Sequence, residues 1–535
     1  MAKNASQVYV GTLDNELNPK ATPQNKKIRG REDEQVFNNA GGAVFSLDKW
    51  GYFDRFLILG TEGGSYYVGE RKLTLDNAKN VISCIKENGK RVVDRIVEIS
   101  DQGRAAKNDA AIFALAVAAA YGDAETVEYA FNNLGKVCRI GTHLFNFMEA
   151  FNTFGKWRAV AKRGVASWYA RGEDKLAVQL LKYQQRNGWS HRDVLRLAHV
   201  KPKSEVHNAL FYWVTNDKKH LAGVKMPDIV YAFESLHKEP SVKAAKAAIR
   251  DFKLTWEMLP TQLLNETAVW EELLPEMGLT AMIRNLGRMS SIGLINPLSN
   301  AEKLVVSRLS DGEALKAARV HPISVLSALK TYGAGKGDRG SLTWKTSQRV
   351  VDALNDAFYA AFGFIEPSGE NYLLGIDCSG SMFGASVNGV RNLTAAEASA
   401  VMALATAKVE KNYWIGGFNT GMGELKISPR MRLDDVLRVM RNFNWGGTDC
   451  AQPMLYAIAN KMNIDKFCVY TDNETWAGRI HPTQALEQYR NKYGKGKLIV
   501  AGTSATNFTI ADPKDAGMLD LVGFDAAAPQ LISQF

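Results

Sequence analysis

The sequence predicts an α-helical repeat array followed by an α/β domain with a doubly wound parallel sheet. From about residue 36 to 365, apolar residues recur at steps of three and four, and short Gly, Asn or Pro breaks separate the stretches. After Pro367, apolar runs of strand length alternate with helical stretches, the order typical of a parallel sheet covered on both faces. We therefore expect an N-terminal arm at residues 1–35, a helical module at 36–367 and an α/β domain at 368–535.

The helical pattern is clearest at residues 110–121, 173–186 and 191–198. Paired helices of this kind, with few clear strands among them, favour a helical repeat array, although no strict period fits. Such an array exposes an extended concave or annular surface, which suits a long polymer better than a small substrate. Lys182 and Arg186 are four residues apart in one of the predicted helices, so we expect them to share a face.

The N-terminal 35 residues show no sustained periodicity. They carry Asn, Pro and Gly together with a basic cluster from Lys26 to Arg31. This composition is typical of an extended arm.

The positive charge of the chain is concentrated in one segment. The 535 residues have a net charge of +10, and residues 136–220 contain sixteen Lys and Arg but only six Asp and Glu, with histidines and aromatic residues between them. Basic side chains neutralise phosphates, while aromatic and histidine rings stack on unpaired bases. The alternative is a solvated basic face over an ordinary aromatic core, but the charge concentration favours a nucleic-acid partner.

Cysteine usage and hydropathy indicate the compartment. The five cysteines include no Cys-x-x-Cys pair, which favours a reducing environment. The N-terminus lacks the apolar core of a signal peptide, and no apolar run approaches the ~20 residues needed to span a bilayer. We expect a soluble, cytoplasmic protein without a membrane partner.

The first predicted strand of the α/β domain ends in an Asp-x-Ser-x-Ser loop, at Asp377, Ser379 and Ser381. Thr448 opens a later helix and Asp472 ends the third predicted strand. By itself an Asp-x-Ser-x-Ser string more often marks a polar turn or helix cap. With the later Thr and Asp, the set resembles the metal-ion-dependent adhesion site of von Willebrand factor A domains.

This resemblance implies a divalent cation, most simply Mg²⁺. Ser379, Ser381 and Thr448 would bind it directly or through water, and Asp377 and Asp472 would anchor the hydroxyls and waters. Carboxylates, hydroxyls and water make the oxygen shell that Mg²⁺ prefers. Because few charges surround the ion, it would accept an incoming carboxylate or phosphate, so an acidic protein ligand is one expected partner.

Stretches of both parts resemble the Ro protein family, in which a TROVE module precedes a von Willebrand factor A domain. The matching stretches are FNNAGGAVF (37–45), DRFLILGTEGGSYY (54–67), GTHLF (141–145), KYQQRNGWSHRD (182–193), LRLAHVKP (195–202), RNLGRM (284–289) and FCVYTDNETW (467–476). The resemblance implies a ring of HEAT-like helical repeats closed by the A domain.

By the same resemblance, the protein would bind small noncoding Y RNA on a basic outer surface. It would also pass single-stranded 3′ ends of misfolded or damaged RNA through the ring, acting in RNA quality control and ribonucleoprotein assembly beside an exoribonuclease tethered by Y RNA. Lys182, Arg186 and His199 match family positions associated with Y RNA, although His199 alone could equally be a core histidine. The candidate RNA-binding residues are Lys136, Arg139, His143, Lys182, Arg186, His191, Arg192 and His199.

No catalytic motif accompanies these features. The Gly-rich stretch at residues 333–340 lacks the spacing and the Ser or Thr of a phosphate-binding loop, and neither His-Glu-x-x-His nor Gly-x-Ser-x-Gly occurs. We expect no intrinsic catalysis. The main alternative to an RNA-binding ring is a metal-dependent protein-adhesion scaffold with secondary RNA binding.

Overall fold

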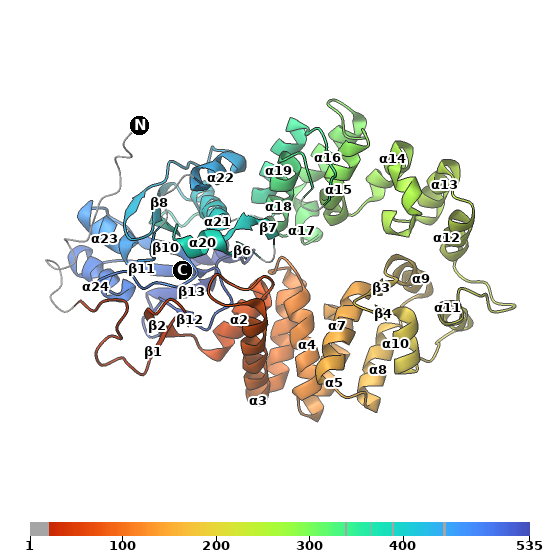
Figure 1. Ribbon diagram of the computed structural model, residues 1–535, viewed down its shortest axis with the longest axis horizontal. Helices are drawn as coiled ribbons and strands as arrows, with labels where there is room; N and C mark the ends of the chain where they lie inside the picture. Colours follow the sequence, from red (N-terminus) through yellow and green to blue (C-terminus); the bar gives the residue numbers. More distant parts are fainter. Residues whose placement is uncertain (1–20, 338–339, 364, 388–389, 442–445) are drawn as a thin grey trace.

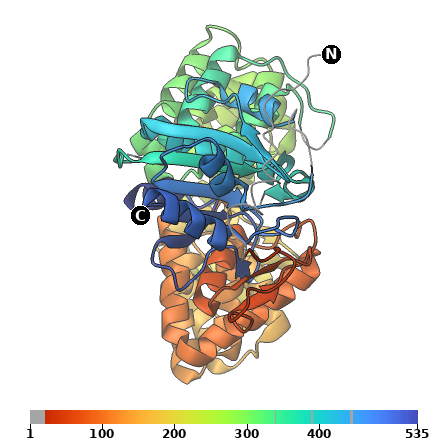
Figure 2. The same cartoon turned by 90° about the vertical axis from the view of Figure 1, so that its left-hand side faces the viewer.

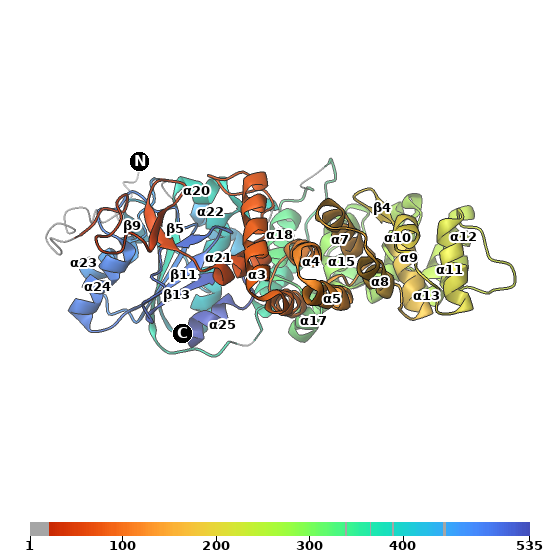
Figure 3. The same ribbon diagram turned by 90° about the horizontal axis from the view of Figure 1, so that it is seen from below.

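The computed structural model describes residues 21–337, 340–363, 365–387, 390–441 and 446–535. Figure 1 shows helices following one another around a ring, with the α/β domain closing it between the first and last helices. Seen edge-on in Figure 3, the helical arc and the α/β domain lie side by side in one layer. The predicted fold class is confirmed.

The ring begins with helices that pack pairwise along the chain. They are α2 (Lys49–Leu59), α3 (Glu70–Gln102), α4 (Asp109–Tyr121), α5 (Ala124–Asn132), α6 (Leu134–Val137), α7 (Gly141–Phe154), α8 (Ala159–Trp168), α9 (Glu173–Lys182), α10 (His191–Ala198) and α11 (Glu205–Thr215). Helix α4 is apolar on all sides because it lies between α3 and α7 and is buried along almost its whole length.

The second half of the ring returns to the α/β domain. It comprises α12 (Asp228–Lys238), α13 (Val242–Phe252), η1 (Trp256–Met258), η2 (Thr261–Asn265), α14 (Thr267–Leu273), η3 (Leu274–Glu276), α15 (Leu279–Ser291), α16 (Asn300–Leu309), α17 (Gly312–Ala317), α18 (Pro322–Gly333) and α19 (Gln348–Ala360).

The helix predicted over residues 173–186 is shorter than expected. Helix α9 ends at Lys182, and a small hairpin follows, with strands β3 (Gln185–Arg186) and β4 (Trp189–Ser190). Its turn residues Asn187 and Gly188 have φ angles of 51° and 77°. Positive φ at both positions matches the right-handed strand twist, which is why Asn-Gly favours a two-residue hairpin over a continued helix. The prediction that Lys182 and Arg186 share a helix face is therefore wrong.

The α/β domain has a six-stranded sheet in the order β13-β11-β10-β5-β8-β9, parallel except for the edge strand β9. Its strands are β5 (Asn371–Asp377), β8 (Asn412–Phe418), β9 (Met422–Glu424), β10 (Lys466–Thr471), β11 (Lys497–Gly502) and β13 (Met518–Val522), with a hairpin of β6 (Ser386–Val387) and β7 (Val390–Thr394) beside it. The helices are α20 (Gly380–Gly384), α21 (Ala395–Val409), α22 (Leu433–Arg441), α23 (Gln452–Ala459), α24 (Pro482–Tyr493) and α25 (Ala528–Gln534).

Alternating side chains of the sheet enter two separate cores. Leu374 and Ile376 of β5 belong to the larger core, which includes α21 and extends into the helical ring, whereas Leu373 packs with α23 and α24. Successive residues of a strand point to opposite faces, so a strand covered on both faces is apolar throughout. Figure 2, which looks onto the α/β domain, shows the sheet crossing between these helices.

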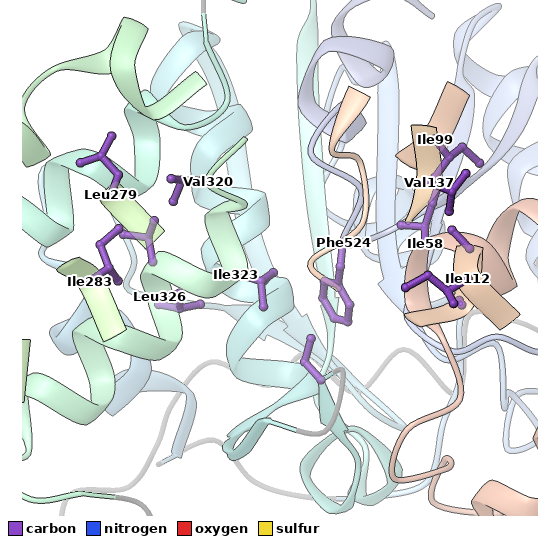
Figure 4. Close-up of a cluster of buried hydrophobic side chains, with 14 of the residues drawn as sticks. Ile58, Ile99, Ile112, Val137, Leu279, Ile283, Val320, Ile323, Leu326 and Phe524 are labelled. Atoms are coloured by element: carbon purple, nitrogen blue, oxygen red, sulfur yellow. The ribbon is translucent and has the colours of Figure 1, made fainter. Parts of the chain in front are cut away.

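The ring closes where Phe524 and Asp525 meet both ends of the helical array. Figure 4 shows the buried Phe524 ring between Ile323 of α18 and Ile58 of α2. Arg104, after α3, forms an ion pair with Asp525, and its carbonyl lies 3.1 Å from the ring nitrogen Nε2 of His321, the N-cap of α18. The first and last parts of the array thus meet at the α/β domain.

The N-terminal residues that the structure describes are not an extended arm. Strands β1 (Gln35–Phe37) and β2 (Ala43–Ser46) form a three-stranded sheet with β12 (Phe508–Thr509) of the α/β domain. Arg31 pairs with Asp512, which lies shortly after β12. The prediction of an arm is wrong for residues 21–35, because specific hydrogen bonds hold them on the α/β domain; residues 1–20 lie outside the described part. In the structure the helical array begins at α2.

All five cysteines are buried and unpaired. Among the described helices, none is long and apolar enough to cross a membrane.

Candidate RNA-binding cavity and metal site

A cavity of about 1380 Å³ lies inside the helical ring, between its two halves. Residues of α2, α4 and α7 line one side, and residues of η1 and α15 line the other. Its volume exceeds the roughly 300–1,000 Å³ of small-molecule pockets. The charged and polar side chains on its wall include Glu62, Lys107, His143, Asn146, Lys182, Arg186, Glu257, Arg284 and Asn285.

Three of the predicted RNA-binding residues meet at this cavity. Lys182 ends α9, Arg186 lies exposed on the following hairpin, and His143 lies in the first turn of α7. The Lys182 ammonium is 3.4 Å from the Glu257 carboxylate. Burial, together with the charge of Arg139, lowers the pKa of His143 to about 4, so this ring is neutral at physiological pH. Of these three residues, Lys182 and Arg186 therefore carry the positive charge.

Four other predicted residues lie away from the cavity wall. Lys136 is exposed in α6, and Arg139 donates hydrogen bonds to Ser100 Oγ and the Lys136 carbonyl, both at 3.0 Å. Arg192 forms a 2.8 Å ion pair with Asp217. His199 is exposed in a left-handed conformation with φ 50° at the end of α10. These residues remain candidates for contacts outside the ring, and His199 is not a core histidine.

His191 is a core residue, contrary to the prediction that it contacts RNA. Its side chain is buried beside Phe145 and Trp168, and its Nδ1 lies 2.9 Å from the Tyr169 hydroxyl. Burial lowers the pKa of His191 to about 4. His191 lies on the buried face of the amphipathic helix α10, together with Val194, Leu195 and Ala198. This face packs against α8.

The cavity also contains residues that the charge pattern did not predict. Lys107 pairs with Glu62, while Trp256 and Arg284 come from the opposite half of the ring. Trp256 stacks near Trp270, with ring centroids 6.5 Å apart. These residues are distant from the basic segment in sequence, so only ring closure brings them to the same surface.

The predicted metal residues meet at the carboxyl edge of the sheet. Asp377 ends β5 and Asp472 follows the neighbouring strand β10, where the chain crosses from one half of the sheet to the other. Parallel sheets bind ligands at such a switch point. The hydroxyls of Ser379 and Ser381 are 3.1 Å apart. All five predicted side chains, including Thr448, are buried.

Hydrogen bonds orient both carboxylates at this edge. Asp377 accepts from the Ser379 amide at 2.9 Å and from the Thr471 hydroxyl at 2.7 Å. Asp472 accepts from the Glu474 amide at 3.1 Å and from the Ser381 side chain. Burial raises the pKa of Asp377 and of Asp472, and the charge of Asp472 raises that of Asp377 further. A nearby cation would offset this cost and keep both carboxylates ionised.

Glu474 is a third acidic group that the sequence motif did not predict. Its carboxylate accepts hydrogen bonds from the Asn39 side chain at 2.7 Å and the Ala40 amide at 3.0 Å. Burial and the charge of Asp472 raise the pKa of Glu474 to about 7. The hydrogen bonds from Asn39 and Ala40 of the N-terminal segment oppose this rise in pKa, a contact that the loop sequence alone did not reveal.

The side chains present fit a hard divalent cation. Among the ion pairs of the described residues, none involves Asp377 or Asp472, so their charge has no Lys or Arg partner there. No group of three or more His, Cys, Asp and Glu side chains in the described ranges is placed to hold a metal, so any ion would rely on hydroxyls and water. Hydroxyl and carboxylate oxygens are ligands that Mg²⁺ accepts and that soft metals avoid.

The ring, its internal cavity and the attached α/β domain define a class of RNA-binding proteins. Residues 36–331 match the TROVE domain model, and residues 371–535 match the Ro60 vWA domain model. The chain belongs to the Ro protein family.

Relatives match nearly the whole chain. It is 37% identical over 523 residues to a Deinococcus radiodurans protein named RNA-binding protein RO60, covering 97% of this chain and 98% of the relative. A Caenorhabditis elegans protein with the same name is 35% identical over 617 residues, covering 99% and 94% respectively. The crystal structure of Deinococcus radiodurans Ro (RSR) matches with a TM-score of 0.68 at 35% identity, covering 91% of this chain and 99% of that one.

Proposed function

We propose that this protein binds small noncoding Y RNA through basic surface residues and receives single-stranded 3′ ends of misfolded or damaged RNA in its ring cavity. The cavity lined by Lys182 and Arg186 carries this proposal. Both relatives are named RNA-binding proteins, which supports RNA as the partner. The corresponding role is RNA quality control and ribonucleoprotein assembly in the cytoplasm.

The cavity wall favours a single strand over a duplex or a folded protein. It combines cations from both halves of the ring, two of them paired with Glu62 and Glu257, with amide side chains such as Asn146 and Asn285. Cations bind phosphates, and amides can hydrogen-bond to the Watson–Crick edges of bases, which only unpaired nucleotides expose. A protein-adhesion scaffold would not require this internal surface, so we place protein binding at the metal site instead.

An RNA hairpin with a single-stranded 3′ tail is expected to bind more tightly than the same hairpin with a blunt end. The tail adds phosphate contacts inside the ring, so its advantage should shrink steeply as salt rises. Filter binding or fluorescence anisotropy over a salt series measures both effects. Equal affinity for the two RNAs at low salt would contradict entry of the tail into the cavity.

We also propose that Ser379, Ser381, Thr448, Asp377 and Asp472 hold Mg²⁺. The ion would supply a Lewis-acidic position for the carboxylate of an acidic protein ligand. The proposal is supported by the two buried carboxylates of Asp377 and Asp472, which form no ion pair with a Lys or Arg of the described residues. We do not propose that the protein is a catalyst. An exoribonuclease partner would be recruited through the Y RNA.

Mg²⁺ is expected to raise the melting temperature of the wild type but not of Asp377→Asn. At a Mg²⁺ concentration a hundredfold above Kd, binding stabilises the folded state by about 2.7 kcal/mol. Without Mg²⁺ the variant should be at least as stable as the wild type, because the substitution removes repulsion from Asp472. Calorimetry with and without Mg²⁺ provides the measurement.

Asp465→Asn is the matched control, because Asp465 precedes β10 at the opposite edge of the sheet and pairs with Lys495. It should keep the full Mg²⁺ response. If Mg²⁺ raised the melting temperature of Asp377→Asn as much as that of the wild type, Asp377 would not be part of a Mg²⁺ site.

A further inference from the structure

Gln24 of the N-terminal segment, residues 21–47, contacts both loops that carry the proposed metal ligands. Its side chain is completely buried, with an exposed fraction of 0%. The Nε2 group donates to Asp449 Oδ1 at 2.6 Å and to the Ile480 carbonyl at 2.7 Å, and Oε1 accepts from the Thr475 hydroxyl. One amide side chain therefore bridges the loop after Thr448 and the loop after Asp472.

The two loops are also linked to each other at this point. Thr475 Oγ accepts from the Cys450 amide at 3.0 Å, and the Trp476 amide donates to the Thr448 carbonyl at 3.0 Å. The Asp449 carboxylate that receives Gln24 also accepts from the Ala451 amide at 3.0 Å. Movement of Gln24 would therefore change the position of Thr448 relative to Asp472.

A second part of the N-terminal segment holds the Asp472 loop from the other side. Asn38 Nδ2 donates to the carbonyls of Asn473 at 3.0 Å and Thr475 at 2.8 Å. A Cβ on Gly42 would lie only 1.7 Å from the Thr475 carbonyl oxygen, so the backbones meet there without room for a side chain. The loop can be held this closely only when the N-terminal segment is docked.

We propose that Gln24 is a positioning residue for the metal site, and that docking of the N-terminal segment and cation binding stabilise each other. This inference rests on the proposed Mg²⁺ site. Partners that orient metal ligands typically change metal affinity by about 10–100-fold when they are removed. Because coupling between two binding events is reciprocal, the cation must strengthen docking of the segment by the same factor by which docking strengthens cation binding.

The segment has other anchors that do not contact the metal loops. The Thr22 amide donates to Gln484 Oε1 of α24 at 3.0 Å, and Lys514 pairs with Glu34 at 2.9 Å. If Gln24 only fastened the segment, loss of any of these anchors would have the same effect on Mg²⁺ affinity. Gln484→Ala is therefore a matched control for Gln24→Ala.

The test is Mg²⁺ titration of the full-length chain by calorimetry, with Mn²⁺ binding followed by electron paramagnetic resonance as the spectroscopic readout. Gln24→Ala is expected to lower Mg²⁺ affinity at least about tenfold and to change the Mn²⁺ spectrum, while Gln484→Ala changes neither. Equal Mg²⁺ affinity in Gln24→Ala and wild type would overturn the positioning role while leaving the metal site intact. Absence of Mg²⁺ binding to the wild type would overturn both.

Hydrogen exchange of the wild type tests the reciprocal effect without a variant, in case Gln24→Ala does not fold. The amides of Gln24 and Leu47 donate to the Gly478 and Asn507 carbonyls of the α/β domain, both at 2.9 Å, and report docking of the segment. Saturating Mg²⁺ should slow their exchange at least about tenfold. Unchanged exchange of these amides in a Mg²⁺-bound protein would overturn the coupling.

Discussion

The double substitution Lys182→Ala and Arg186→Ala is expected to lower affinity for RNA with a single-stranded 3′ tail by about 100-fold. Each charged contact to a phosphate contributes about 1.5 kcal/mol, and 1.4 kcal/mol corresponds to a factor of ten. Loss of Lys182 also leaves the Glu257 carboxylate without its cation on the cavity wall, where it repels phosphate. The effect should therefore exceed that of removing the charge alone.

The salt dependence separates phosphate contacts from a folding defect. Two fewer phosphate contacts should make the logarithmic salt slope shallower by about 1.4 for a single strand. Lys426→Ala with Arg430→Ala removes the same charge from exposed positions on the α/β domain and should change affinity little. A parallel loss of affinity in both double variants would mean that net charge, rather than the cavity, controls RNA binding.

Phe524→Ala is expected to release the α/β domain from one side of the ring. Phe524 is 2% exposed and lies between α18 and α2, where truncation of a buried phenylalanine costs about 3–5 kcal/mol. The neighbouring Arg104–Asp525 ion pair then becomes exposed to water and contributes less. The melting temperature should fall, and small-angle X-ray scattering should show a larger radius of gyration below the transition.

Phe147→Ala is the control for this loss of packing. Phe147 is equally buried but lies within the helical array, in α7 against Phe131 and Phe151. Its truncation should lower the melting temperature without separating the α/β domain. If Phe524→Ala keeps the wild-type radius of gyration and tail affinity, closure does not depend on this junction.

The two carboxylates of the proposed metal site could be placed from the sequence because each lies at the end of a strand that is recognisable locally. Asp377 follows an apolar run and Asp472 follows another, and parallel strands bring their carboxyl ends to one edge. Only pattern and topology are needed for that conclusion. Glu474 and Gln24 were missed because their roles depend on contacts with residues more than 400 positions away.

The RNA surface was predicted less accurately. Charge counting located the segment that contains Lys182 and Arg186, yet it also included His191, which the fold buries. A count of basic residues and histidines does not show which of them lie on the buried face of an amphipathic helix, as His191 does in α10. The helix predicted over residues 173–186 likewise ends early, because the positive φ angles that Asn187 and Gly188 adopt favour a hairpin turn.

The sequence by itself determined the helical and α/β elements and the location of the excess positive charge, while the five residues of the proposed metal site were assigned by resemblance to A domains. The elements and the charge excess follow from local periodicity, turn chemistry and composition, which act over a few residues. Tertiary structure alone decided that the helices close into a ring at Phe524, that Lys107 and Arg284 join Lys182 at one cavity, and that residues 21–47 hold the metal loops. Those features depend on contacts between distant segments, whose partners are chosen by packing and burial rather than by local sequence.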